Sequence, residues 1–229
     1  MGENITAWHT ASAGIVIYIG EKYGVGFDIF ARDPKQLYPD TPESVREELL
    51  SEIAAGHIET LVFTHEHADH FQLEDVLEAL RRNPRLRTIS TEEVVRQIRE
   101  KEPGAGRLTA VPASEQKYRV VELPDMRLTL FNSLHMGEEF ADIQNLVCLL
   151  EAGGKRLMLP GDAKPTKAMY ERAAAWSKKI DWLIAPFPLM GLPSSRRLMA
   201  RYLEPMHVLA IHLPRPEKDT DGWRKNAEH

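Results

Sequence analysis

The residues best suited to chemistry lie in one run of six, His65-Glu66-His67-Ala68-Asp69-His70. Three imidazoles and one carboxylate in this run are side chains that zinc, iron and manganese accept as ligands. On a tight turn, His65 and His67 can point one way while Asp69 and His70 point another. That arrangement suits two adjacent metal ions better than one. The alternative, a solvated histidine-rich loop, is disfavoured because the run follows a buried strand pattern.

The elements on either side of this run must hold it in place. Residues 60–64, Thr-Leu-Val-Phe-Thr, have the apolar, β-branched pattern of a short buried strand. Leu73, Val76, Leu77 and Leu80 then recur at helical spacing. The sequence therefore predicts a metal site on a strand-to-helix turn.

The first part of the chain has the turn and helix-capping residues expected between strands and helices. Residues 15–19 and 25–29 read as a hairpin with a turn at 20–22, and 86–89 as a further strand. Thr41 is expected to cap a helix with Pro42 at its first position, and Gly56 to end it. Ser90 and Glu93 form a capping box for the next helix.

The second part is richer in strands. Gly153-Gly154 is a plausible hairpin turn, Thr166 is expected to cap one helix, and Ser194 or Ser195 another. A short terminal helix is expected within 219–228. No composition shift marks a linker, so we expect a single domain, 1–229. Strands with amphipathic helices in both halves suit two sheets packed face to face with helices outside. The predicted strands are 108–111, 118–121, 127–131, 145–150, 156–159, 182–185 and 208–211.

Three more candidate ligands fall at predicted strand ends. His135 follows the strand 127–131, Asp162 follows 156–159, and His212 closes 208–211. A strand end is where a rigid element delivers a side chain to a site. Each of these residues is a weak signal alone and gains weight from the order in which they occur.

The order of these motifs resembles the metallo-β-lactamase superfamily over nearly the whole chain. The motifs are HxHxDH, a later His, Gly-Asp, and then a His after an apolar strand. The resemblance implies an α/β fold, a four-layer αββα sandwich of two mixed β-sheets packed face to face with helices outside. Asp28 resembles the acidic residue that supports the histidine loop in this family. The implied first metal site is His65, His67 and His135, the second is Asp69, His70 and His212, and Asp162 bridges them.

The implied chemistry is metal-assisted hydrolysis of an ester, lactone, thioester or phosphoester. Two divalent ions about 3.5–4 Å apart can share a hydroxide nucleophile, and Asp69 would be catalytic by orienting it. We expect two Zn²⁺ ions, with Mn²⁺ or Fe as alternatives. The compact length and early motif resemble small lactonase-like hydrolases, including those similar to ascorbate-6-phosphate lactonase. His at position 67, where the flavin-partnered di-iron oxygen reductases carry Glu, argues against that branch.

Two other functions stay open at this point. One is a phosphodiesterase or nuclease that uses the same metals. The other is a non-catalytic metal-binding protein on the same fold, against which the complete set of ligand positions counts.

The composition limits the kinds of binding partner that we expect. The chain has 229 residues, 43% of them hydrophobic, and a net charge of −5, which gives no general attraction for nucleic acid or anionic membranes. The single cysteine, Cys148, and the lack of a long apolar run or signal peptide favour a cytoplasmic protein. The resemblance to small lactonase-like hydrolases implies a small-molecule substrate. His9 is a candidate for lining the site. Arg196, Arg197 and Arg215 are candidate anion binders, although a surface role is favoured for all three.

Overall fold

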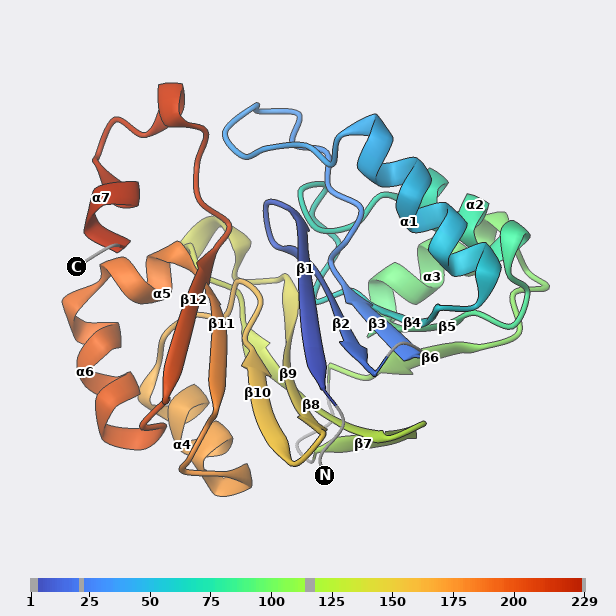
Figure 1. Cartoon of the computed structure of the whole chain (residues 1–229). Coiled ribbons are helices and arrows are strands. Elements are labelled where there is room, and N and C mark those ends of the chain that lie inside the picture. Colours follow the sequence, from blue (N-terminus) through green and yellow to red (C-terminus); the bar gives the residue numbers. More distant parts are fainter. Residues whose placement is uncertain (1–3, 21–22, 114–117, 228–229) are drawn as a thin grey trace. The chain divides into compact units, whose positions relative to one another are not determined.

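A computed structural model describes residues 4–20, 23–113 and 118–227 (Figure 1). The chain forms two compact units, residues 1–115 and 116–229. The expected turn residues Glu21 and Lys22 lie outside the described residues, as does the last residue of the expected terminal helix, Glu228. None of the helices in the described ranges combines the length and apolar character that a bilayer crossing requires.

The first unit contains a mixed sheet whose strands occur in sequence order from β1 to β6 among its described residues. The pairs β1–β2 and β2–β3 are antiparallel, and β3–β4, β4–β5 and β5–β6 are parallel. Three helices are the crossovers that parallel pairing requires. The elements are β1 (Ile5–Ala11), β2 (Gly14–Ile19), β3 (Tyr23–Phe27), α1 (Glu43–Ala55), β4 (Ile58–Val62), α2 (Leu73–Arg82), β5 (Arg87–Thr91), α3 (Glu92–Lys101) and β6 (Leu108–Val111).

One apolar core joins the three helices to this sheet. It includes Leu50 of α1, Val76 of α2 and Ile98 of α3, packed with Leu61 of β4, all of them fully buried. Figure 1 shows α1, α2 and α3 grouped beside the strands β3 to β6. The amphipathic faces recognised in the sequence are therefore the faces that cover the sheet.

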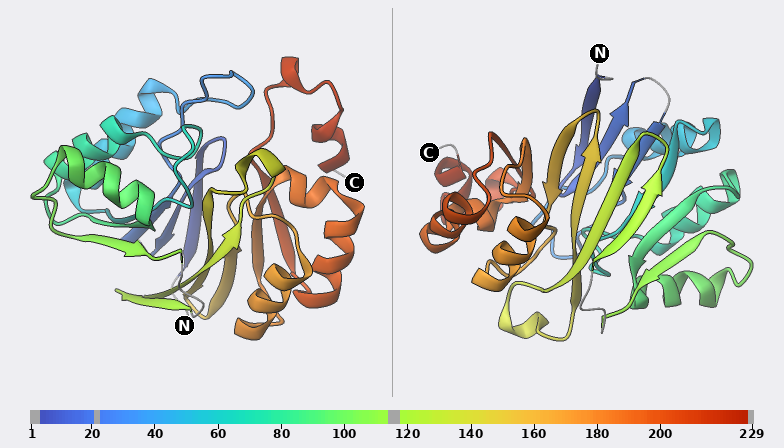
Figure 2. Two further views of the ribbon diagram at one scale, coloured as in Figure 1. Left: turned by 180° about the vertical axis from the view of Figure 1, so that it is seen from behind. Right: turned by 90° about the horizontal axis from the view of Figure 1, so that it is seen from below.

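The second unit also contains a mixed sheet whose described strands are neighbours in sequence order. Its sheet runs β12-β11-β10-β9-β8-β7 in the described part of the chain, with antiparallel pairs from β7 to β10 and parallel pairs from β10 to β12. Figure 2 shows α4 and α6 together beside this sheet. The elements are β7 (Arg119–Leu123), β8 (Met126–Leu134), β9 (Gln144–Ala152), β10 (Lys155–Leu159), α4 (Lys167–Trp176), β11 (Trp182–Pro186), α5 (Phe187–Gly191), α6 (Pro193–Tyr202), β12 (His207–Ile211) and α7 (Trp223–Ala227).

Several local predictions are confirmed. Thr166 accepts a hydrogen bond from the Met169 N–H (3.2 Å) at the start of α4. Gly56 ends α1 in the left-handed region (φ +79°), where a side chain would be strained. Gly153 and Gly154 both have positive φ and close the β9–β10 hairpin, as expected for this turn type.

Three capping predictions are wrong, because the hydroxyls of Ser90, Thr41 and Ser195 form hydrogen bonds outside the helices that they were expected to cap. Ser90 donates to the Phe63 carbonyl (2.7 Å), and Thr91 caps α3 instead. The Thr41 hydroxyl accepts the Ala31 N–H and donates to the Ile29 carbonyl, and α1 begins after Pro42. Ser195 lies inside α6 against the Tyr170 hydroxyl (2.7 Å), and α6 begins at Pro193.

Candidate metal-binding groups

The predicted histidine turn leaves the end of β4 and reverses before α2. The N–H groups of His70 and Phe71 both donate to the His67 carbonyl, at 3.0 and 2.8 Å, which closes the turn. His65 and His70 are fully buried, and His67 and Asp69 are half-buried. The turn is therefore a compact one whose side chains have few alternative positions.

Asp28 anchors this turn from the end of β3. One carboxylate oxygen accepts the Thr64 N–H (2.8 Å), and the other accepts the Thr64 hydroxyl (2.7 Å) and the His70 Nδ1–H (2.9 Å). The carboxylate is almost fully buried, and its backbone has φ +50°. The interpretation of Asp28 as the support of the histidine loop is confirmed.

This network assigns the protons of two histidines. His70 donates from Nδ1 to Asp28, so its Nε2 is the nitrogen that can bind a cation. The Thr64 hydroxyl gives its only proton to Asp28, so it must accept from His65 Nδ1 at 3.0 Å. His65 Nε2 then faces His67 Nδ1 at 3.1 Å. Two imidazole nitrogens that converge in this way match neighbouring ligands of one cation.

The second unit brings its three candidates together at the ends of three strands. His135 follows β8 directly and pairs with Ala163, Asp162 follows β10, and His212 follows β12. One oxygen of Asp162 lies 3.7 Å from His135 Nε2 and 3.5 Å from His212 Nε2. Both histidines are buried, and the carboxylate sits between them.

Asn145 is a positioning residue that the sequence analysis missed. It is fully buried on β9, donates to the Pro160 carbonyl (2.9 Å) and accepts the Asp162 N–H (3.0 Å). His135 Nδ1 donates to the Met136 carbonyl, which leaves its Nε2 facing Asp162. The available signal was an asparagine inside an apolar strand, since a buried amide must find partners.

One histidine and three arginines were the other candidates from the sequence. His9 is exposed on β1, with its Nε2 3.0 Å from the Ser12 carbonyl, and its role in lining the site stays a prediction. Arg196 and Arg197 are exposed on α6, and Arg215 is half-buried after β12. Burial raises the pKa of the Glu66 carboxyl, and the nearby charge of Glu93 adds to the shift.

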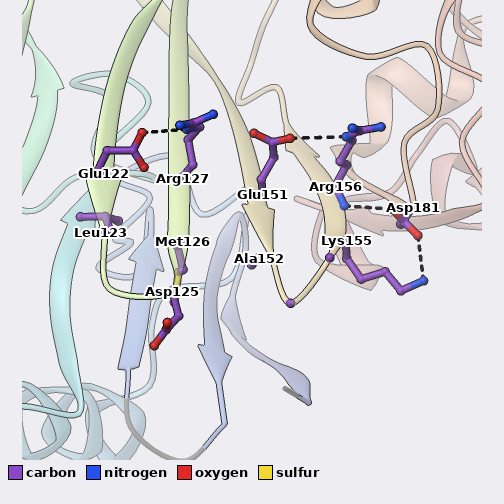
Figure 3. A pocket seen from close by; sticks show the side chains of 12 residues that line it. Glu122, Leu123, Asp125, Met126, Arg127, Glu151, Ala152, Lys155, Arg156 and Asp181 are labelled. Atoms are coloured by element: carbon purple, nitrogen blue, oxygen red, sulfur yellow. Dashed lines mark hydrogen bonds and ion pairs between the residues drawn. The ribbon is translucent and has the colours of Figure 1, made fainter. Parts of the chain in front are cut away.

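A cavity of about 590 Å³ in the second unit is not a candidate site (Figure 3). It lies at the β7–β8 and β9–β10 turns, whereas the ligand group lies at the other ends of β8 and β10. Six of its seven charged side chains form ion pairs with one another. The pairs are Glu122 with Arg127, Glu151 with Arg156, and Asp181 with Lys155.

Solved structures with the same fold cover nearly the whole chain. The metallo-β-lactamase fold protein YhfI from Bacillus subtilis is 13% identical, with a TM-score of 0.62 over 95% of this chain and 84% of that one. Igni18, a metallo hydrolase from the archaeon Ignicoccus hospitalis, is 17% identical, with 0.62 over 98% and 90%. The short form of human tRNase Z is 10% identical, with 0.58 over 93% and 90%.

The chain thus has the metallo-β-lactamase fold, and the predicted α/β class with two mixed sheets is confirmed. No curated protein sequence matches it. A family model described as the β-lactamase superfamily domain matches residues 38–208. The chain belongs to this family, and its enzyme class is metal-dependent hydrolase. Its histidine and aspartate groups contain residues that could hold metal ions.

Proposed function

We propose that the protein is a binuclear metal-dependent hydrolase of an ester, lactone, thioester or similar bond. The family match spans both units and six of the proposed ligands, and His212 lies just beyond its end. The proposed first metal site is His65, His67 and His135, the proposed second is Asp69, His70 and His212, and Asp162 is the proposed bridge.

The observation that carries this proposal is the assignment of protons on three buried histidines. Hydrogen bonds occupy Nδ1 of His65, His70 and His135, through Thr64, Asp28 and the Met136 carbonyl. In each imidazole this leaves Nε2 as the atom able to bind a metal. Metal-binding histidines usually have their second nitrogen held in this way.

When bound, two divalent ions would lower the pKa of water and polarise the scissile carbonyl. Asp69 is half-buried on the same turn as His67 and His70, and we assign it the orientation of the attacking water and acceptance of its proton. A set of histidines and carboxylates suits Zn²⁺ first and Mn²⁺ or Fe second. A small-molecule substrate and a cytoplasmic location remain part of the proposal.

A phosphodiesterase or nuclease is the second candidate, because the fold likeness includes human tRNase Z. The net charge of −5 disfavours it, since nucleic-acid binding depends on neutralising phosphates with Lys and Arg.

The test combines metal analysis with a hydrolase panel of lactones, esters, thioesters and phosphodiesters. Protein purified without chelator should carry close to two transition-metal ions per chain and hydrolyse at least one class. Asp162→Asn should lower turnover by about 100-fold or more, with thermal unfolding nearly unchanged. Asp125→Asn, an exposed turn residue of the same unit, is the matched control and should behave as wild type.

Each failure has a different meaning. No bound or titratable metal would refute the proposal as a whole. Two bound ions without hydrolysis of any substrate would favour the non-catalytic alternative, and phosphodiesters as the sole substrates would favour the second candidate. Full turnover in folded Asp162→Asn would exclude Asp162 as the bridge.

A further inference from the structure

Arg32 lies beside the histidine turn, in the segment between β3 and α1 that Figure 1 draws as an extended blue loop. Its N–H donates to the Ala68 carbonyl (2.8 Å), inside the metal-binding run. The Gln72 side-chain amide contacts the carbonyls of Arg32 (3.4 Å) and Ala68 (2.7 Å). The backbone of Arg32 is therefore fixed next to the turn that carries His67 and Asp69.

The loop that follows Arg32 is held by Asp33. This buried carboxylate accepts the N–H groups of Lys35 (2.9 Å), Leu37 (2.7 Å) and Tyr38 (2.8 Å), and the Asp33 N–H donates to Asp40 (2.7 Å). A loop organised in this way loses little entropy when a ligand binds beside it.

The ends of the segment are also tied together. The Ala31 N–H donates to the Thr41 hydroxyl (3.0 Å), which itself donates to the Ile29 carbonyl (3.1 Å). The Thr41 N–H donates back to the Ala31 carbonyl (2.9 Å). Arg32 thus projects from a closed loop whose position is set on both sides.

The Arg32 side chain is exposed, and within the described ranges its guanidinium has neither an ion pair nor a side-chain hydrogen bond. The adjacent carboxylates of Asp33 and Asp40 already accept backbone N–H groups. Four other arginines of the first unit do pair with carboxylates. These are Arg46, Arg81, Arg82 and Arg96.

We propose that Arg32 binds an anionic group, a carboxylate or a phosphate, that the substrate carries apart from its scissile bond. The planar guanidinium donates two parallel hydrogen bonds to either anion, so both share one recognition chemistry. The inference rests on the proposed hydrolase function, because it makes Arg32 a specificity-determining residue of that site.

The first test measures binding without metal, so that the ions cannot capture the anion. Metal-free protein is titrated separately with glutarate and with inorganic phosphate, and chemical shifts are followed by NMR. Wild type should bind at least one anion saturably, and the tighter one identifies the group. Arg32→Ala should weaken binding about 10- to 100-fold, and Arg32→Lys should weaken it less. Arg99→Ala, an exposed arginine in the last turn of α3, is the matched control and should match wild type.

The second test compares kcat/KM for a neutral lactone and for the same lactone carrying a carboxylate or a phosphate monoester. Metal-loaded wild type should prefer one charged form, and Arg32→Ala should lose that preference while its rate on the neutral lactone is unchanged. Equal anion binding by wild type and Arg32→Ala overturns the inference, as does an unchanged preference. Arg32-dependent anion binding without any hydrolysis would keep Arg32 as an anion-binding residue but reject the hydrolase function, and with it the assignment of that anion to a substrate.

Discussion

Replacing Asp28 by asparagine tests how the histidine turn is positioned. Asn is tolerated at positive φ, so the backbone of residue 28 (φ +50°) can stay as it is. The carboxylate makes three hydrogen bonds as an acceptor, and the amide can accept with one end only. If its oxygen accepts the Thr64 N–H, its NH₂ group faces His70 and reverses the tautomer. If its oxygen faces His70, its NH₂ group meets the Thr64 N–H.

Either outcome has a cost that can be estimated. A buried polar group left without its hydrogen bond costs about 1–3 kcal/mol of unfolding free energy. Loss of the group that orients a metal-binding histidine usually weakens metal affinity about 10- to 100-fold, and a reversed His70 tautomer removes Nε2 as a ligand. We therefore expect Asp28→Asn to weaken the metal site that uses His70, and to lower the stability of the metal-free protein.

The assay is chelator competition for metal affinity, with urea unfolding of the metal-free protein beside it. Asp75→Asn is the matched control, because Asp75 is also buried in the first unit but pairs with Arg46 (2.6 Å), and neither residue belongs to a candidate metal-binding group. It should destabilise the fold and leave metal affinity unchanged. Unaltered affinity in folded Asp28→Asn would refute the reasoning, and so would an equal loss of affinity in Asp75→Asn.

Three further predictions use the same measurements. Asp69→Ala should weaken the second metal more than the first and His67→Ala the reverse, whereas equal loss of both ions in each variant would indicate one shared site. Asn145→Ala should lower the free energy of unfolding by about 1–3 kcal/mol in urea, because it leaves the Pro160 carbonyl and the Asp162 N–H without their partner; wild-type stability would contradict this. Gly56→Ala should cost about 1–2 kcal/mol through its positive φ, while Gly106→Ala, where φ is not positive and space is open, should be nearly neutral; equal effects would contradict the backbone argument.

Local signals in the sequence predicted the elements whose reasons are local. The helical spacing of Leu73, Val76, Leu77 and Leu80, the Thr166 cap and the Gly153-Gly154 hairpin each depend on a few neighbouring residues. The histidine run was recognisable for the same reason, since its ligands are neighbours in the chain.

The missed features depend on distant partners. Ser90 and Thr91 are both plausible caps, and the choice between them follows from the Phe63 carbonyl, 27 residues away from Ser90. β1 has no clear alternation because five of its seven residues are exposed or half-buried, and α5 occupies a segment for which no element was predicted. The hydrogen bond from the Asp162 N–H to the Asn145 side chain joins residues 17 apart in the sequence, and no local pattern predicts it.

The order of strands in the two sheets also bears on how the chain folds. In the described parts of both sheets, every strand pairs with the strand next to it in sequence. Each pairing therefore closes only a hairpin or a single crossover, and low sequence separation between contacts favours rapid folding. During synthesis the strands from β1 to β6 can assemble before β7 has been made, since N-terminal segments emerge first. Each sheet can thus form from its own segment of the nascent chain, and no strand made early depends on pairing with a strand of the other sheet made later.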